Sequence, residues 1–387
     1  MGGNALKNVG VVRLPARLYA ALAEQVVARL TGHAAGNADG ALFPGLQARA
    51  IPAVRAKADF GDLDVLVTHP ESGWGFDEAR RAALTAVFQP TRVVTNGPVL
   101  SFDVAAPGHA DARSRYAQEC FRVPHHWALP KDGEACSLNV SRENRFQVDL
   151  IQVPPDVFAF ALGYFSYNDL GNLLGRVARL HGFKLGHNGL FRPLRSPGNE
   201  SHFVRDVLVT RDWPKALQFL GYDPARWELG FDSMEEMFAF VMDSRAFYPS
   251  AFPLEHRSHR ARVRDRKRPT YTAFLQWLAD RELDQAAQLD DDALAVMQQW
   301  ALAYALDQFE DFAKEWQQAH ADLKDGLAFR QRFNGDVVRQ LTGLDGAALG
   351  QHMRGLRARF SSDEALRAFV RGASDEALEA FIRYGKT

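Results

Sequence analysis

The stretch GDLDVLVTHP at residues 61–70 places two acidic side chains, Asp62 and Asp64, at the start of a short apolar run. The run DVLV at residues 64–67, bounded by a glycine and a His-Pro pair, predicts a strand. Side chains two positions apart in a strand point to the same face, so the two carboxylates are expected side by side. Their repulsion favours a divalent cation, although such a pair alone is more often a solvated turn. Mg²⁺ prefers carboxylate oxygens, water and substrate phosphates, which suits an ion that also binds a nucleoside triphosphate.

A third carboxylate, Asp149, lies in the apolar segment FQVDLIQV at residues 146–153, which also predicts a strand. An aspartate between Val148 and Leu150 is expected to be paired or aimed at a ligand, because burying an unpaired charge is costly. If the two strands are neighbours, three carboxylates converge. One of them can then act as general base on an attacking hydroxyl, while two metal ions stabilise an in-line displacement.

The first half of the chain alternates between helical and strand-like patterns. Apolar residues at helical spacing predict helices over residues 17–30, 78–87 and 169–181. A strand-like stretch at residues 92–104 is interrupted by Asn96-Gly97, which is a hairpin signal. A second, shorter hairpin is expected over residues 182–192.

From residue 193 onwards the pattern becomes helical. A loop with Pro197 and Gly198 is followed by shorter helical segments. Helices are then expected over residues 270–284, 291–320, 324–341 and 345–358, followed by two terminal helices. The terminal pair carries an echo, SDEALRAF and SDEALEAF, which indicates two similar surface helices rather than a solenoid. This order predicts an α+β domain followed by helical domains.

Composition sets further bounds. The chain has 387 residues, of which 47% are hydrophobic, so two or three domains with a sizeable core are expected. A net charge of −1 argues against a passive nucleic-acid coat, yet allows a local basic groove. Cys120 and Cys136 are too few for a disulfide framework. Neither a signal-peptide pattern nor a long apolar run is present in the sequence, so a cytoplasmic protein with no membrane partner is expected.

The motifs around the three aspartates resemble those of a known family. GDLDVLVTHP closely resembles the catalytic motif of X-family, DNA polymerase β-like nucleotidyltransferases. Residues 148–194 resemble the same family, with its third aspartate, a Tyr-Phe turn, a helix and a hairpin ending in Arg-Pro-Leu. VRLP at residues 12–15 is a weaker match. The resemblance covers roughly residues 9–245, with a weak stretch at 95–140, and leaves no room for the family's amino-terminal lyase domain.

The resemblance implies a fold and a division into domains. It implies an α+β nucleotidyltransferase palm with a mixed sheet and flanking helices over residues 1–194. A thumb-like subdomain over residues 195–248 would follow, and then an all-α C-terminal domain over residues 249–387 that is expected to bind nucleic acid.

The resemblance also implies roles for individual residues. Asp62 and Asp64 would bind both of two Mg²⁺ (or Mn²⁺) ions, and Asp149 would bind the catalytic one. The implied nucleotide-binding residues are Arg13, Arg55 and Gly61 at the phosphates, Tyr164 and Phe165 at the sugar, and Asp169 and Asn172 at the base or sugar. Composition alone offers plainer interpretations, because the two aromatic residues also fit a core and the two arginines also fit a solvated surface.

Three departures from the family pattern stand out. The Gly-Ser turn that precedes the first aspartate is absent, since residues 51–54 read IPAV. Tyr167 replaces a glycine after the Tyr-Phe turn, and a tyrosine resists backbone geometries that a glycine allows. Gln147 replaces an arginine two residues before Asp149, with Arg145 nearby. The metal site is therefore expected to be intact, while the phosphate and nucleotide contacts are expected to be rebuilt.

The run HRSHRARVRDRKR at residues 256–268 is densely basic and is predicted to contact a phosphate backbone. Its candidate nucleic-acid-binding residues are Arg257, Arg260, Arg262, Arg264, Arg266, Lys267 and Arg268. The alternative is a solvated helix face. Residues 333–353 are faintly similar to the tail of CCA-adding enzymes and to a helix-hairpin-helix, but a plain helix-turn-helix corner fits equally well.

These observations predict an enzyme that adds nucleotides to a DNA or RNA 3′ hydroxyl and releases pyrophosphate. Templated polymerisation and untemplated tailing both stay open. A second class is nucleotide transfer to a protein or small molecule, which the basic run argues against. A third is a nucleic-acid-binding protein that has lost catalysis, which the three carboxylates make the least favoured.

Overall fold

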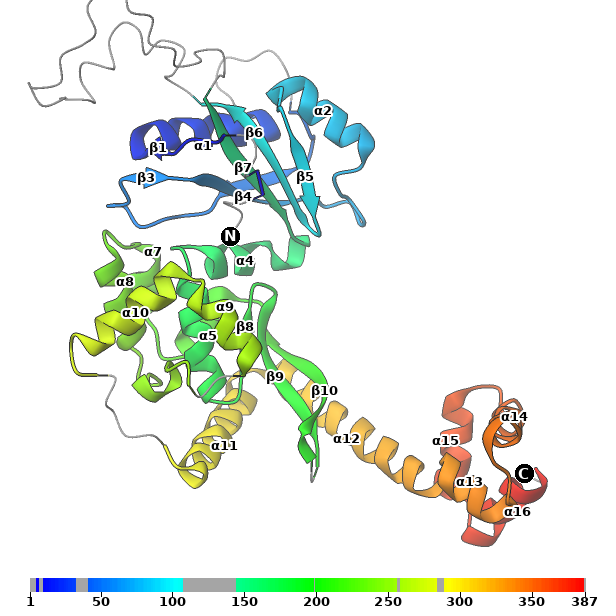
Figure 1. Cartoon of the computed structure of the whole chain (residues 1–387). Coiled ribbons are helices and arrows are strands. Elements are labelled where there is room, and N and C mark those ends of the chain that lie inside the picture. Colours follow the sequence, from blue (N-terminus) through cyan, green and yellow to red (C-terminus); the bar gives the residue numbers. More distant parts are fainter. Residues whose placement is uncertain are drawn as a thin grey trace, which may run out of the picture. The chain divides into compact units, whose positions relative to one another are not determined.

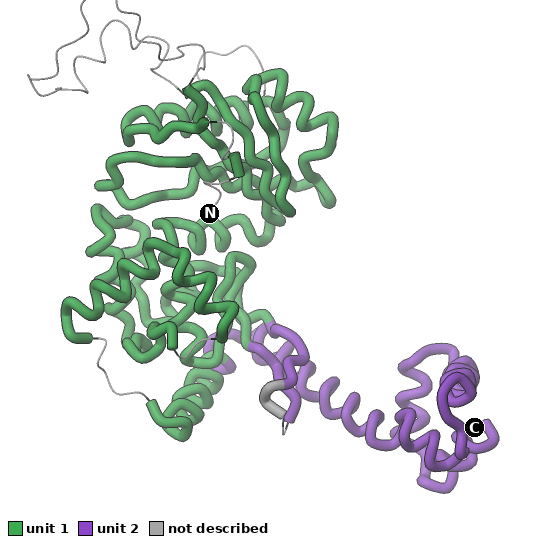
Figure 2. Tube along the Cα trace, in the orientation of Figure 1, with its two compact units in different colours: residues 1–192, 208–305 green, residues 193–207, 306–387 purple. Residues whose placement is uncertain are grey.

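The structure is a computed structural model that describes residues 5–6, 10–32, 41–106, 144–197, 199–255, 258–283 and 289–385. The chain divides into two compact units (Figure 2): residues 1–192 with 208–305, and residues 193–207 with 306–387. These units do not follow the boundaries of the three expected domains, which stay a prediction. In the described part of the chain, no helix combines the length and apolarity needed to cross a membrane.

The first unit contains a five-stranded sheet in the order β2-β4-β7-β6-β5 (Figure 1). Its strands are β2 (Gln47–Ala50), β4 (Asp62–Thr68), β5 (Val93–Asn96), β6 (Val99–Ala105) and β7 (Arg145–Gln152). β4 and β7 run parallel, whereas the other neighbours are antiparallel, so the sheet is mixed. The expected α+β class with a mixed sheet is confirmed, as is the hairpin at Asn96-Gly97.

One face of this sheet forms the main core. Alternate strand residues, such as Leu63 and Val65 on β4 and Val148 on β7, are fully buried in one hydrophobic cluster. Helices α1 (Ala16–Thr31) and α2 (Glu78–Phe88) supply the apolar side chains that cover it. Because strand side chains alternate between faces, the intervening residues, including Asp62, Asp64 and Asp149, point to the other face.

The other face meets helix α4 (Phe158–Phe165), which follows a short 3₁₀ turn at Pro155–Val157. Leu66 on β4 and Ile151 on β7 pack there against Ala161 of the helix. In Figure 1, α4 lies directly below the sheet. Polar residues therefore share this second face with a small apolar cluster that anchors the helix.

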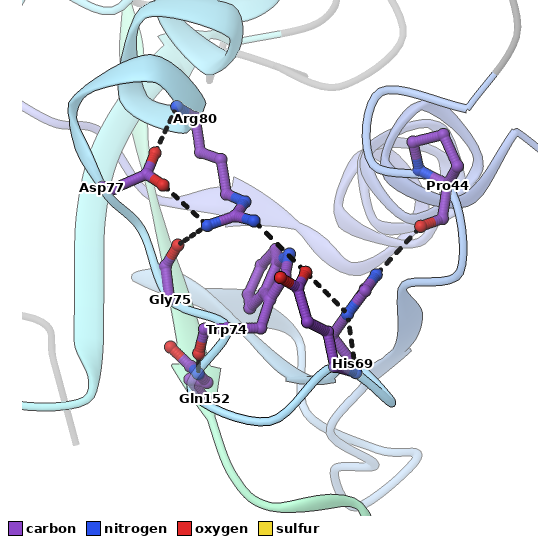
Figure 3. A network of polar contacts seen from close by, with 8 residues as sticks. Pro44, His69, Trp74, Gly75, Asp77, Arg80 and Gln152 are labelled. Atoms are coloured by element: carbon purple, nitrogen blue, oxygen red, sulfur yellow. Dashed lines mark hydrogen bonds and ion pairs between the residues drawn. The ribbon is translucent and has the colours of Figure 1, made fainter.

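A polar network holds the loop after β4 (Figure 3). The His69 ring accepts a hydrogen bond from the Glu71 backbone at Nδ1 (3.1 Å), so Nε2 carries the proton and donates to the Pro44 carbonyl (3.0 Å). The His69 ring stacks on the Trp74 ring, with 5.2 Å between the ring centroids. The guanidinium carbon of Arg80 lies over the same Trp74 ring, 5.1 Å from its centroid. This network fixes the carboxyl end of the strand that carries Asp62 and Asp64 at its start.

The remainder of the first unit is mostly helical. It comprises α5 (Leu170–Leu180), β8 (Lys184–Gly186), α6 (Trp213–Phe219), α7 (Pro224–Glu228), α8 (Met234–Met242), a 3₁₀ turn (Pro249–Ala251), α9 (His259–Arg266), α10 (Pro269–Ala279) and most of α11 (Asp291–Gln308). The helix expected over residues 291–320 is interrupted at Phe309, which is the N-cap of the next helix.

After residue 193, Pro197 lies in a turn, as expected, but the expectation of short helical segments directly after it is wrong. β9 (Gly189–Ser196) continues through this point, and β10 (Asn199–Thr210) pairs with it in a three-stranded sheet of order β10-β9-β8. Val207 and Val209 are buried while the residues between and beside them are more exposed. This alternation with a period of two is typical of a strand, so a strand follows the turn at Pro197 where short helices were expected.

The second unit has a core of its own. Its helices are α12 (Glu310–Arg332), α13 (Gly335–Thr342), α14 (Gly346–Arg357), α15 (Asp363–Gly372) and α16 (Asp375–Tyr384), around one hydrophobic cluster. The helix expected over residues 324–341 is broken at Asn334, which caps α13. The echoed sequences begin α15 and α16, where Ser362 and Ser374 each accept a hydrogen bond from the backbone three residues on. Both helices bury apolar residues in the shared core, so they are more than surface helices.

Candidate metal centre

Three carboxylates converge on the face of the sheet opposite the main core. β4 and β7 pair in parallel with Asp64 opposite Asp149 and Asp62 opposite Gln147. Asp62, Asp64 and Asp149 each offer a carboxylate oxygen, and these oxygens all lie within 4.8 Å of one another. The sequence predicted that the three carboxylates converge if the two strands are neighbours. The strands are neighbours, and this convergence is confirmed.

The electrostatics of this cluster oppose three full negative charges. Burial, together with the charges of Asp62 and Asp149, raises the pKa of Asp64 to about 6. Burial likewise raises the pKa of Asp149, which is fully buried. Two like charges about 4 Å apart repel by about 4 kcal/mol at an effective dielectric constant near 20.

The donor set therefore matches a hard divalent cation. Mg²⁺ and Mn²⁺ prefer oxygen ligands, and the cluster offers three carboxylates on one face. A cation would also remove the repulsion among these groups, because its charge offsets theirs. The three aspartates therefore fit a metal ion of this kind. The expected number of ions, two, rests on the family resemblance alone.

Two polar side chains, Gln147 and Ser101, orient the carboxylate of Asp149. The sequence did not predict this role for either of them. Gln147 is fully buried, and its amide nitrogen lies 3.0 Å from both carboxylate oxygens of Asp149. Ser101 stands opposite Asp149 on β6, and its hydroxyl hydrogen bond, like that of Gln147, lowers the pKa that burial raises. The sequence feature that could have predicted this contact is the position of Gln147 two residues before Asp149, because side chains two positions apart in a strand share a face.

Arg145, the arginine noted near Gln147, is committed to another partner. Its Nε lies 2.6 Å from Oδ2 of Asp103, and both side chains are almost fully buried. Asp103 also accepts hydrogen bonds from Thr91 and from the Arg92 backbone. Burial alone would raise the pKa of Asp103, but these bonds outweigh it and leave that pKa below its usual range. This ion pair braces β6 against β7 beside the aspartates.

Arg13 lies beside the cluster, near Gly61 and Asp62, and its phosphate-binding role stays a prediction. The short strands β1 (Leu14–Pro15) and β3 (Asp59–Phe60) pair antiparallel and bring Arg13 next to Gly61. A Cβ atom at Gly61 would lie 2.9 Å from Nη1 of Arg13, so the tip of the exposed Arg13 side chain approaches the Gly61 backbone closely. Arg13 forms an exposed ion pair with Asp59 at 2.7 Å. That hydrogen bond, and then the charge of Asp62, raise the pKa of Arg13.

Arg55 is held by a different group of residues. Its guanidinium pairs with Asp232 and donates to the Leu229 carbonyl at 2.8 Å. The backbone of the same segment is bound too, since Arg55 N–H donates to the Phe231 carbonyl at 3.0 Å. These contacts hold Arg55 on the segment at residues 229–232, and its phosphate-binding role stays a prediction.

The turn after the Tyr-Phe pair keeps a glycine-like backbone without a glycine. Tyr167 and Asn168 have φ values of 59° and 61°, in the left-handed region that a bulky residue rarely adopts. Tyr167 N–H donates to the Pro52 carbonyl at 2.7 Å, and its ring packs edge-on against Trp227 and Phe231. These contacts hold the strained turn and bury the ring.

The four residues implied at the sugar and base cluster around the start of α5. The Tyr164 carbonyl packs so closely on Gly171 that a Cβ there would lie 2.1 Å from it. Phe165 stacks on His187 at 5.5 Å between centroids. Asp169, the N-cap residue of α5, forms an ion pair with Arg268, and Asn172 lies one turn further along the helix.

The basic run forms α9 and its junction with α10. Arg260, Arg264, Arg266 and Lys267 are exposed, Arg262 and Arg268 are half-buried, and Arg257 lies outside the described residues. A solvated helix face and a nucleic-acid contact both require such exposure. The ion pair of Arg268 with Asp169, however, shows that this run reaches the start of α5.

No protein-family model matches this sequence, and no curated protein matches it.

Proposed function

We propose that this protein is a Mg²⁺-dependent nucleotidyltransferase of the DNA polymerase β-like class. It would transfer a nucleoside monophosphate from a nucleoside triphosphate to the 3′ hydroxyl of DNA or RNA and release pyrophosphate. The observation that carries the proposal is the convergence of Asp62, Asp64 and Asp149 from two parallel strands. The order of motifs along the chain, from Gly61-Asp62 to the hairpin at residues 182–192, resembles that of DNA polymerase β-like enzymes and supports this proposal.

Asp149 is the best candidate for the base in this reaction. Its burial raises its pKa, so it holds a proton more readily than an exposed aspartate does. Gln147 and Ser101 orient its carboxylate. The 3′ oxygen of the acceptor forms a bond to the α-phosphorus while Asp149 accepts the proton of that hydroxyl. The bond between the α-phosphorus and the oxygen that leaves with pyrophosphate breaks. Bound Mg²⁺ would supply compensation for the negative charge on the phosphates and the attacking oxygen.

Arg13 and Gly61 are the proposed contacts of the triphosphate. The Arg13 side chain is 61% exposed, and its pair with Asp59 is a surface ion pair of the kind worth about 1 kcal/mol or less. Such a pair can be exchanged for a phosphate, which binds arginine in a bidentate manner. Gly61, which lacks a side chain, leaves room for Arg13 next to Asp62.

The basic run on α9 supports a nucleic-acid acceptor rather than a protein or a small molecule. Arg260, Arg264, Arg266 and Lys267 all expose their charges within about two helical turns. Neighbouring cations on one short segment attract a polyphosphate backbone and release its counterions.

Primer extension tests the proposal. The full chain is incubated with Mg²⁺, labelled single-stranded or duplex primers, and each NTP or dNTP in turn. We expect extension by the native protein, loss by at least about a thousandfold in Asp64→Ala, and no loss in Glu24→Gln, which changes an exposed carboxylate on α1. Full activity of Asp64→Ala contradicts the proposal. Label on protein, with none on nucleic acid, identifies a protein acceptor instead.

A further inference from the structure

Helix α11, at the margin of the first unit in Figure 1, carries apolar residues on two of its faces. One face is attached to the rest of the unit, since Nε2 of Gln298 donates to the Leu180 carbonyl at 3.1 Å. The other face exposes three large apolar side chains by 50% to 75%, namely Val296, Trp300 and Tyr304. They are four positions apart and form one continuous row along the helix. A helix that is apolar all round is expected to be buried all round, so this exposed face is a candidate interaction surface.

The exposed positions of α11 follow a pattern that reads the same from either end of the helix. About the midpoint between residues 299 and 300, each exposed position has an exposed counterpart at the same distance on the other side. The central six of these positions, which we call the α11 stripe, are Ala295, Val296, Gln299, Trp300, Ala303 and Tyr304. Their sizes are complementary across the midpoint, because Tyr304 mirrors Ala295 and Val296 mirrors Ala303.

This symmetry makes the α11 stripe complementary to itself. In a two-fold dimer, each residue that contacts a second residue across the interface is matched by the reverse contact. Two antiparallel α11 helices that meet at their midpoints put Tyr304 of one copy over Ala295 of the other. Val296 likewise faces Ala303, so large side chains meet small ones, as close packing requires. A parallel pair would instead put Trp300 on Trp300 and Tyr304 on Tyr304.

The charges of α11 argue against a nucleic acid as the occupant of the stripe. The helix contains no lysine or arginine, and Asp292 and Asp307 flank the stripe at its two ends. Aromatic side chains that stack on the bases of a single strand normally stand in a positively charged groove, which holds the phosphates.

The size of the stripe predicts a weak contact. A whole aromatic side chain contributes about 200 Å², so the exposed parts of Trp300 and Tyr304 offer roughly 250 Å² on each copy. Even with Val296 and the alanines, this is below the area of about 800 Å² per partner that is typical of a stable interface. The Tyr304 ring already stacks on Phe219, at 5.8 Å between centroids, so it loses little freedom on association. A reversible dimer, rather than a permanent one, is therefore expected.

We propose that α11 is a dimerisation helix, through which two copies of this chain associate reversibly by their antiparallel α11 stripes. This inference does not depend on the transferase proposal. At each end of the contact, Asp292 of one copy faces Asp307 of the other. Their repulsion weakens the dimer, and it does so more at low ionic strength, where charges are less screened.

Sedimentation velocity of the full chain tests the dimer. Between about 1 and 200 μM, the weight-average mass should rise from that of one chain toward that of two. Trp300→Gln is expected to raise the dissociation constant by at least about tenfold, because a central aromatic residue carries much of such a contact. Leu229→Gln, which changes another large apolar side chain that is 71% exposed, is the matched control and should leave the constant unchanged. A native chain that stays monomeric, or a dimer that Trp300→Gln does not weaken, overturns the inference.

Asp292→Lys tests the antiparallel direction. In an antiparallel pair the new lysine faces Asp307 at each end, so the dissociation constant at low ionic strength should fall by about threefold or more. In a parallel pair lysine would face lysine, and the constant would not fall. Asp291→Lys makes the same change of charge one residue away, where it faces Gln308, and is expected to have a smaller effect. No fall in Asp292→Lys, or an equal fall in both variants, contradicts the proposed contact.

Two further measurements guard against misfolding and against a different occupant. If Trp300→Gln lowers the midpoint of thermal unfolding, Ala295→Arg keeps all three large side chains but fills the space opposite Tyr304, and it should prevent the dimer as well. Binding of labelled single-stranded DNA is measured for the native chain and for Trp300→Gln. A monomeric native chain whose DNA binding is lost in Trp300→Gln would make the stripe a surface for stacked bases and overturn the inference.

Discussion

Asp64 on β4 and Asp149 on β7 stand directly opposite each other in the parallel register of the two strands. Neighbouring strands lie about 4.8 Å apart, so this register alone brings the two carboxylates within reach of one cation. Burial then denies them the water that would screen their charges, and it raises the pKa of each. The cluster is destabilising by itself and becomes favourable with a bound divalent ion.

Removing one charge is therefore expected to stabilise the metal-free protein. A pKa of Asp64 of about 6, above its ordinary value of 3.8, means that the folded protein loses stability as the pH rises through this range. In EDTA at pH 7.5, Asp64→Asn should raise the free energy of unfolding by about 3 kcal/mol, and this gain should vanish near pH 4. Thermal unfolding measures it. Mg²⁺ should stabilise the native protein but have no effect on the variant. A destabilised Asp64→Asn would contradict this account, and Glu24→Gln should change nothing.

Metal affinity should depend on pH in the opposite sense. The ion requires ionised carboxylates, so protonation of Asp64 competes with binding. Below pH 6 the affinity for Mn²⁺ is expected to fall by about tenfold per pH unit, as measured by electron paramagnetic resonance of free Mn²⁺. An affinity that stays constant from pH 7.5 to pH 5 would show that Asp64 is not a ligand.

Gln147 is expected to act on the metal through Asp149. In Gln147→Met the carboxylate loses two hydrogen bonds of 3.0 Å, so the pKa of Asp149 should rise further. Metal affinity should fall by about 10- to 100-fold, as for other groups that orient a ligand, and its pH dependence should move to higher pH. Gln152→Met, on the same strand but bonded to the Trp74 carbonyl, is the matched control. Equal losses in the two variants would indicate a general effect on the strand.

The ion pair of Arg145 and Asp103 should matter for stability rather than for binding. Arg145→Met leaves a buried carboxylate without its cation, which is expected to cost about 3–5 kcal/mol. Urea unfolding measures this cost. Arg211→Met removes the exposed pair with Asp156 and should cost about 1 kcal/mol or less. A similar small cost for Arg145→Met would show that the remaining hydrogen bonds to Asp103 suffice.

The left-handed turn shows how tertiary contacts override a local preference. The replacement of a glycine by Tyr167 suggested a rebuilt turn, because the left-handed backbone is unfavourable for tyrosine. The turn keeps that geometry, with φ 59°, since the ring packs against Trp227 and Phe231, and the backbone bonds to Pro52. These partners lie tens of residues away, and no local pattern identifies them.

The sequence by itself determined which residues form β4 and β7 and which face each aspartate takes. These depend on apolar runs and on the two-residue period of strands, which are local properties. Only the tertiary structure decided that the two strands are neighbours, that Gln147 and Ser101 orient Asp149, and that Arg268 reaches Asp169. Strand register and ion pairs between distant segments depend on how the whole chain packs, because the free energy of these contacts is shared among elements far apart in sequence.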